Sequence, residues 1–176
     1  SVEAYVDKLA SLGISSTKED FFTSSQATIL YLNNKHRQSK IYCQGTKSLI
    51  KELNDAGLNI TEEVEDNIDV VLLGFDTELT SQKLRNTCEA LLQDVDYVAT
   101  NPDLVCPVSF GYVPDCGSVA IMLKNATGKY PMFIGKPEPT MINYVMEKYG
   151  YSGVYRVTDY SHPFDSYTGE DVLLLD

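Results

Sequence analysis

The sequence has little of the material from which several common functional sites are built. Its 176 residues include two histidines and four cysteines, and no two cysteines stand in a CxxC spacing. Histidine metal sites and histidine proton relays therefore have few candidate residues, and neither a structural zinc site nor a disulfide framework is indicated. Reduced thiols in a cytoplasm are the simpler interpretation, so we expect a cytoplasmic protein.

Long apolar runs and positive charge are also scarce. The longest apolar run, VVLLGF at 70–75, is far too short to span a bilayer. The first residues show no basic segment followed by an apolar one, so nothing points to export. Lys and Arg number 14 against 25 Asp and Glu, which gives a net charge of −11. Because nucleic acids and anionic membranes bind clustered Lys and Arg, we expect neither as a partner.

Strand-like and helix-like segments alternate along the chain. Strands are predicted at 40–45, 68–75, 97–100, 132–135, 154–157 and 171–175, and helices at 2–12, 26–33, 46–55, 78–94, 118–128 and 140–150. A long loop is expected at 104–117. The run IDVVLLGF is apolar nearly throughout, as expected of a strand covered on both sheet faces. This alternation indicates an α/β fold with a largely parallel sheet.

Hydroxyl side chains stand where several of these helices begin. Ser24 or Ser25 is a candidate N-cap for the helix at 26–33, and Thr77 or Thr80 for the helix at 78–94. Ser118 has the same position at the start of its own helix. Capping alone would explain these residues.

The candidate binding residues lie in polar turns, after a predicted strand or before a predicted helix. They are Asn101, Asp103, Asp115, Gly117 and Ser118. The carboxyl ends of parallel strands are where α/β sheets bind ligands, and backbone amides in such loops can surround an anion. Ordinary turn and capping chemistry is an equally available explanation for each residue alone. Their clustering at strand ends favours a binding site.

Lys136 lies in another turn of this kind, GKPEP, between a predicted strand and a predicted helix. Gly135 permits another group to approach closely, and Pro137 fixes the backbone near the helix start. This arrangement suits a lysine held toward an anion, with the helix N-terminus adding partial positive charge. A surface lysine in a proline-stiffened turn is the alternative.

The order of these motifs resembles the haloacid-dehalogenase (HAD) superfamily, and more narrowly its NagD-like, 4-nitrophenylphosphatase-like subfamily. The motifs are, in order, FFTSSQAT, IYCQGTKSLIKEL, VVLLGFD, YVATNPD, GYVPDCGS and FIGKPEP, and the match runs from residue 1 to about residue 149. The resemblance implies an HAD-like fold, in which a parallel-sheet α/β cap domain is inserted into a Rossmann-like core. Residues 23–129 would form the cap, and 1–22 and 130–176 would be parts of the core.

The resemblance also implies a function. It points to a hydrolase of small phosphate monoesters that acts through an aspartyl-phosphate, with Mg²⁺ offsetting charge at the phosphoryl group. Lys136 would steady the nucleophile and the phosphate, and the loops at 101–103 and 111–118 would close over the substrate. The partners would be a small phosphorylated metabolite and a second copy of the chain, paired through the cap. The cap loops do not identify the metabolite.

The sequence departs from the family pattern where the chemistry is carried. The DxDG string that supplies the nucleophilic aspartate does not occur, and VTDYSHPFD stands where GDxxxTD would bind magnesium. Asp159 lacks the preceding glycine and is a candidate magnesium ligand. One alternative is therefore a catalytically incomplete cap that serves in binding or dimerisation. Another is an ordinary phosphatase whose remaining motifs lie beyond the ends of this sequence.

Overall fold

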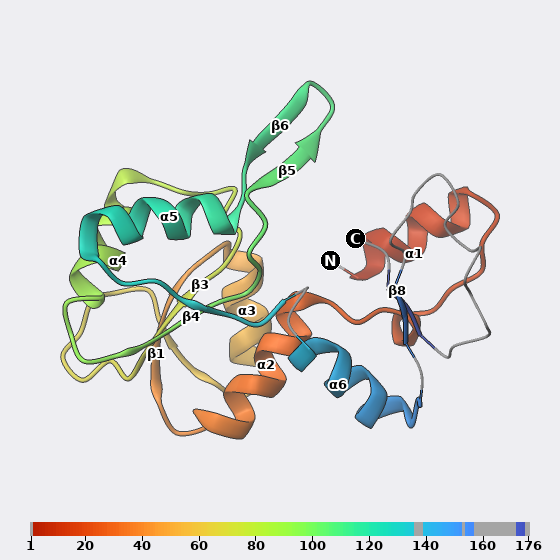
Figure 1. The fold of residues 1–176 in the computed structure, drawn as a ribbon, viewed down its shortest axis with the longest axis horizontal. Helices are drawn as coiled ribbons and strands as arrows, with labels where there is room; N and C mark the ends of the chain where they lie inside the picture. The colour runs from red at the N-terminus through yellow and green to blue at the C-terminus, as the bar shows by residue number, and fades with distance from the viewer. Residues whose placement is uncertain (1, 136–138, 153, 157–171, 175–176) are drawn as a thin grey trace.

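The computed structural model describes residues 2–135, 139–152, 154–156 and 172–174, and its centre is a five-stranded sheet (Figure 1). In order across the sheet, the strands are β2 (Asn59–Thr61), β1 (Lys40–Gln44), β3 (Val70–Leu73), β4 (Asp96–Ala99) and β7 (Met132–Phe133). Every neighbouring pair in this sheet is parallel. The predicted α/β class is confirmed.

Helices connect the strands and cover both faces of the sheet (Figure 1). The helices of the described residues are α1 (Val2–Ser11), η1 (Lys18–Asp20, a 3₁₀ helix), α2 (Ser24–Lys35), α3 (Lys47–Asp55), α4 (Ser81–Ala90), α5 (Cys116–Thr127) and α6 (Pro139–Tyr149). Of these, α1 lies apart from the sheet (Figure 1). Two short strands, β8 (Val154–Arg156) and β9 (Val172–Leu174), form a separate parallel pair. None of the helices in the described part of the chain has the length and apolar character that a bilayer crossing needs.

Each face of the sheet carries its own apolar core, and β3 contributes to both. Val70 and Leu72 pack with α2 and α3, whereas Val71 and Leu73 pack with α4 and α5. All four side chains are fully buried, because successive residues of a strand point to opposite faces. Each such burial contributes about 1.5–3 kcal/mol relative to exposure. The nearly continuous apolar run in the sequence is the signature of this double covering.

The start of α2 differs from the sequence prediction. The N-cap is Thr23, whose hydroxyl accepts a hydrogen bond from the Gln26 backbone N–H at 3.3 Å. The Gln26 side chain accepts in return from the Thr23 N–H at 2.9 Å. This reciprocal pair is a capping box, so neither Ser24 nor Ser25 is the cap. The helix covers Ser24–Lys35 and is longer at both ends than the predicted 26–33.

The predicted loop at 104–117 was also wrong. It contains a β-hairpin of β5 (Val105–Val108) and β6 (Gly111–Pro114), which projects away from the main sheet (Figure 1). α5 follows directly and begins two residues earlier than predicted, with Asp115 as its N-cap. Ser118 is not the cap, and its hydroxyl instead donates to the Leu104 carbonyl at 2.6 Å.

β7 lies beyond residue 129, where the sequence prediction placed the end of the cap. Its residues Met132 and Phe133 pair with Val98 and Ala99 of β4. The central sheet therefore takes one edge strand from the 130–176 segment. The division into 1–22, 23–129 and 130–176 stays a prediction.

Candidate functional site

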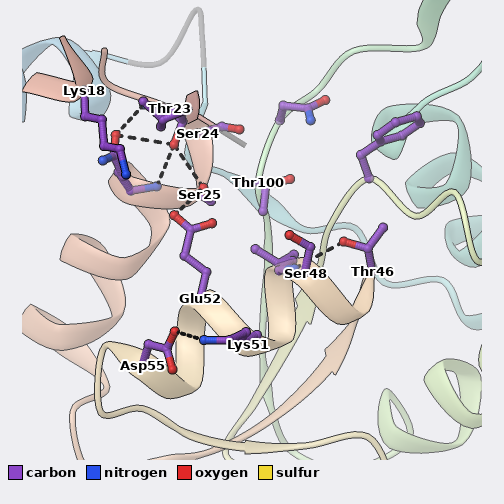
Figure 2. A pocket seen from close by; sticks show the side chains of 15 residues that line it. Lys18, Thr23, Ser24, Ser25, Thr46, Ser48, Lys51, Glu52, Asp55 and Thr100 are labelled. Carbon is purple, nitrogen blue, oxygen red and sulfur yellow. Dashed lines mark hydrogen bonds and ion pairs between the residues drawn. The ribbon is translucent and has the colours of Figure 1, made fainter. Parts of the chain in front are cut away.

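A cleft of about 650 Å³ lies at the carboxyl ends of the central strands, beside the first turns of α2 and α3 (Figure 2). Its lining is rich in hydroxyl and amide side chains, which are Thr23, Ser24, Ser25, Gln26, Thr46, Ser48, Thr100 and Asn101. Two lysines and two carboxylates complete the polar part of the lining. A cleft with this lining can bind a small polar molecule through many hydrogen bonds.

The apolar part of the cleft depends on two glycines at strand ends. A Cβ at Gly45, after β1, would lie 2.8 Å from a methyl carbon of Leu49, and one at Gly74, after β3, would collide with the same methyl group. Glycine at both positions lets Leu49 pack directly over the strand ends. Leu49 and Phe75 thereby line the cleft together.

A hydrogen bond joins the two helical walls of the cleft. The Ser25 hydroxyl donates to the Glu52 carboxylate at 3.0 Å, and it lies 2.9 Å from the Thr23 hydroxyl. Farther along α3, Lys51 and Asp55 form an ion pair (Figure 2). The cleft is therefore bordered by side chains of both signs that are already partnered within the wall.

The five predicted binding residues surround the connection from β4 to α5. The Asn101 side-chain oxygen accepts from the Asp103 N–H at 3.0 Å, and the Gly117 N–H donates to the Asp103 carbonyl at 2.8 Å. A Cβ on Gly117 would collide with the Pro102 carbonyl, so this approach requires glycine. Asn101 lines the cleft. The other four residues do not line the cleft and instead hold the loop between β4 and α5 through the contacts of Asp103, Asp115, Gly117 and Ser118.

Asp115 is an almost fully buried carboxylate with a structural task. Its burial raises its pKa, and the nearby charge of Asp103 raises it further. Hydrogen bonds from the Cys116 N–H and the Asn101 side chain act in the opposite direction. The carboxylate caps α5 by accepting a hydrogen bond from the Cys116 N–H.

The thiol of Cys116 lies at the same helix start but is not an activated nucleophile. Burial raises its pKa to about 11. The thiol donates to the Leu73 carbonyl at 3.5 Å. It is therefore protonated at neutral pH and packed between β3 and α5.

Lys136 and Asp159 lie outside the described residues. Gly135, the neighbour of Lys136, is described, and a Cβ there would lie 2.5 Å from the Thr100 carbonyl and 3.2 Å from the Asn101 Cα. The segment that leads to Lys136 therefore passes directly against the cleft residues at the end of β4.

A partly buried ion pair that the sequence did not predict joins the neighbouring strand ends. The Lys83 ammonium lies 2.8 Å from the Asp76 carboxylate and donates to the Gly45 carbonyl at 2.9 Å. The Asp76 side chain is only 1% exposed. Lys83 thus joins the turn after β1 to the turn after β3. Asp76 ends the VVLLGFD motif. Its partner lies on α4, and no local pattern identifies that partner.

Among the described residues, no group of three or more His, Cys, Asp and Glu side chains is close enough to hold a metal ion. Asp76, the most buried carboxylate beside the strand ends, is occupied by Lys83 and by the Glu78 N–H.

Comparisons with known proteins indicate the same family as the motif order. A family model described as haloacid dehalogenase-like hydrolase matches residues 1–59. An acid sugar phosphatase of Staphylococcus haemolyticus is 30% identical over 145 residues, covering 82% of this chain and 54% of that protein. The 5′-nucleotidase YutF of Bacillus subtilis is 32% identical over 144 residues, covering 82% of this chain and 55% of that protein. The chain thus spans about half the length of these curated relatives.

Solved structures share the fold. A thermostable nitrophenylphosphatase (NPPase) double mutant from Geobacillus stearothermophilus superposes with a TM-score of 0.79 at 33% identity, covering 90% of this chain and 62% of that one. A glycerol phosphate phosphatase from Mycobacterium tuberculosis, in complex with calcium, gives a TM-score of 0.81 at 26% identity, covering 89% and 47%. The motif order, the parallel sheet and these similarities agree. The chain belongs to the haloacid-dehalogenase superfamily, in its NagD-like, 4-nitrophenylphosphatase-like subfamily.

Proposed function

We propose that this chain serves in the hydrolysis of small phosphate monoesters. The observation that carries the proposal is the hydroxyl- and amide-lined cleft at the carboxyl ends of the strands, in a member of a family whose relatives include sugar phosphatases and a nucleotidase. Its volume of about 650 Å³ suits a metabolite rather than a polymer. Phosphorylated metabolites carry the hydroxyl groups that such a lining binds.

Each site residue has a proposed role. Asn101 and the hydroxyl groups of the first turn of α2 would bind the organic part of the substrate. Asp103, Asp115, Gly117 and Ser118 would hold the loops that surround it. Lys136 would supply positive charge to the phosphoryl group, and its proposed place is supported by the contact of Gly135 with Thr100.

The catalytic mechanism that we propose is the one that membership of the family suggests. An aspartyl-phosphate intermediate would divide the hydrolysis into two easier steps. Magnesium would offset phosphoryl charge when bound. The described residues contain no group of three or more His, Cys, Asp and Glu side chains that could hold it, so we assign it no step. Asp159 is the proposed ligand. No DxDG string is present to name the nucleophile.

The cleft also fits a second candidate function. A cap that binds phosphorylated metabolites without hydrolysing them would need the cleft but not the aspartate. In either case we propose a cytoplasmic setting, supported by four cysteines that are all free thiols, and a homodimer paired through the cap at 23–129.

A turnover assay separates the two candidates. The chain and its Lys136→Ala variant would be assayed with 4-nitrophenyl phosphate and Mg²⁺, with calorimetric titration of the same ester in parallel. Turnover that EDTA abolishes and that falls about 100-fold to 1000-fold in the variant supports the phosphatase. Saturable binding with no turnover supports the binding module. If the chain neither binds nor hydrolyses the ester, both proposals fail.

A further inference from the structure

The cleft has two chemically different walls. The first turn of α2 contributes hydroxyl groups, whereas Leu49 and Phe75 form an apolar wall at the ends of β1 and β3. Phe75 is half-buried, so part of its surface is open to a ligand. An aromatic ring binds flat apolar groups through offset-stacked or edge-to-face contact. The apolar wall therefore suits a ligand whose organic part has a flat apolar face.

The turn that carries Phe75 is held on both sides of that residue. On one side, the Gly74 N–H donates to the Gln44 carbonyl at 2.8 Å. On the other side, the Asp76 carboxylate accepts from the Lys83 ammonium at 2.8 Å. The Asp76 side chain is only 1% exposed, so water has little access to replace this partner. Phe75 thus lies between two anchored neighbours, and one of the anchors depends on the charge of Lys83.

Two further polar contacts tie this turn to the start of α3, the helix that carries the other residue of the apolar wall. The same Lys83 ammonium donates to the Gly45 carbonyl at 2.9 Å. The Glu78 carboxylate accepts from the Lys47 N–H at 3.3 Å, and the Glu78 N–H donates to the Asp76 carboxylate at 2.8 Å. The turn after β3 and the first turn of α3 are therefore linked at two points, one of which is Lys83.

Lys83 itself does not line the cleft, because it lies on α4, which covers the sheet face opposite to α2 and α3. We propose that Phe75 determines the ligand selectivity of the cleft and that Lys83 is a positioning residue, which holds Phe75 through Asp76. The preferred ligand is a phosphate monoester whose organic part has a flat apolar face, rather than one that carries hydroxyl groups alone. The inference rests on the proposed binding of phosphate monoesters in the cleft and does not depend on turnover.

Calorimetric titration of the full chain with two esters tests the role of Phe75. The parent chain should bind 4-nitrophenyl phosphate, which has a flat ring, more tightly than glycerol phosphate, which has none. Phe75→Ala should weaken binding of the nitrophenyl ester about tenfold, because the ring contact is lost, and should change the affinity for glycerol phosphate less than about twofold. Leu92→Ala, at a side chain that is 80% exposed and outside the cleft lining, is the control and should change neither affinity. An unchanged affinity for the nitrophenyl ester in Phe75→Ala would refute the role of Phe75.

A double-mutant cycle tests whether Lys83 acts through Phe75. Lys83→Met removes the ammonium group, and it should weaken binding of 4-nitrophenyl phosphate more than binding of glycerol phosphate. The double variant Phe75→Ala/Lys83→Met should bind the nitrophenyl ester within about twofold of Phe75→Ala alone, because the second substitution has no ring left to displace. Equal losses for the two esters, or additive losses in the double variant, would show that Lys83 has only a structural role. Circular dichroism checks folding, and Asp76→Asn breaks the same contact from the other side if Lys83→Met does not fold.

The pair of esters also separates failure of this inference from failure of the proposed function. If the parent chain binds neither ester, the cleft is not a site for phosphate monoesters, and both proposals fall together. If the parent binds the two esters equally well, the proposed function stands and the selectivity assigned to Phe75 is wrong. Tighter binding of the nitrophenyl ester, lost in Phe75→Ala and reduced in Lys83→Met, supports both assigned roles.

Discussion

The Ser25 hydroxyl donates a 3.0 Å hydrogen bond to the Glu52 carboxylate, and this contact joins the first turn of α2 to α3 at the wall of the cleft. The two residues are 27 positions apart in the sequence. The contact makes the cleft wall a joint product of two helices rather than a property of one motif.

Removing this contact should weaken the cleft more than the fold. Ser25→Ala deletes one partly buried hydrogen bond to a charged group, which costs about 1.5–3 kcal/mol at most. We expect a lower affinity for 4-nitrophenyl phosphate, measured by calorimetry, with a cooperative urea transition retained. Asn54→Ala, an exposed residue of α3 outside the cleft lining, is the control and should change neither quantity appreciably. An unchanged affinity in Ser25→Ala would show that this hydroxyl does not shape the site.

Breaking the Asp76–Lys83 pair should be strongly destabilising. Asp76→Asn leaves the Lys83 ammonium, which is 25% exposed, without its carboxylate partner. We expect a loss of about 2–4 kcal/mol in the free energy of unfolding, somewhat below the value for a fully buried pair. Lys51→Ala breaks an exposed pair and should cost less than about 1 kcal/mol. Urea denaturation measures both, and equal losses in the two variants would contradict the interpretation.

Gly117 should not tolerate a side chain. A Cβ there meets the Pro102 carbonyl, so Gly117→Ala must move the loop between Asn101 and Asp103. We expect a loss of about 1–3 kcal/mol, as for overpacking at a close approach. Ser118→Ala, which removes one exposed hydrogen bond, is the neighbouring control and should cost about 1 kcal/mol or less. A Gly117→Ala protein as stable as Ser118→Ala would show that the loop relaxes freely.

Burial of the Cys116 thiol makes stability fall at alkaline pH. Its pKa is about 11 in the folded chain, against 9.0 for an unperturbed thiol. Below pH 9 both states keep the proton, and above it only the unfolded state ionises, so unfolding becomes more favourable as pH rises toward 11. Cys116→Ala should flatten this decline in urea titrations between pH 8 and 11. If the stability of Cys116→Ala declines with pH as steeply as that of the parent chain, the effect belongs to other groups, such as the buried Tyr97.

Elements with long apolar patterns were predictable from the sequence, and the short or irregular ones were not. The run at 68–75 identified β3, because burial on both faces leaves a continuous apolar signal. The β5–β6 hairpin was missed because two prolines and exposed apolar residues obscure the alternation of a half-buried strand. The Thr23 cap was missed because three adjacent hydroxyl residues offer the same chemistry, and tertiary packing selects one of them.

The site was predictable only where its residues belong to local motifs. Asn101 was identified from the strand-end motif ATNPD, and the structure places it in the cleft lining. Ser25 was noted only as a candidate cap, and Glu52 was not singled out, because their contact bridges two helices. The Lys83 partner of Asp76 was missed for the same reason. Residues that act through long-range pairs leave no signal in a single sequence.

Amide chemical-shift mapping would show whether the cleft binds a phosphate monoester. The ¹⁵N-labelled chain would be titrated with 4-nitrophenyl phosphate, with 4-nitrophenol as the control ligand that lacks the phosphate. We predict saturable shifts at Thr23, Ser25, Thr100 and Asn101, weaker binding by Asn101→Ala, and little response to 4-nitrophenol. Shifts confined to residues remote from the cleft, or equal responses to the two ligands, would contradict the account.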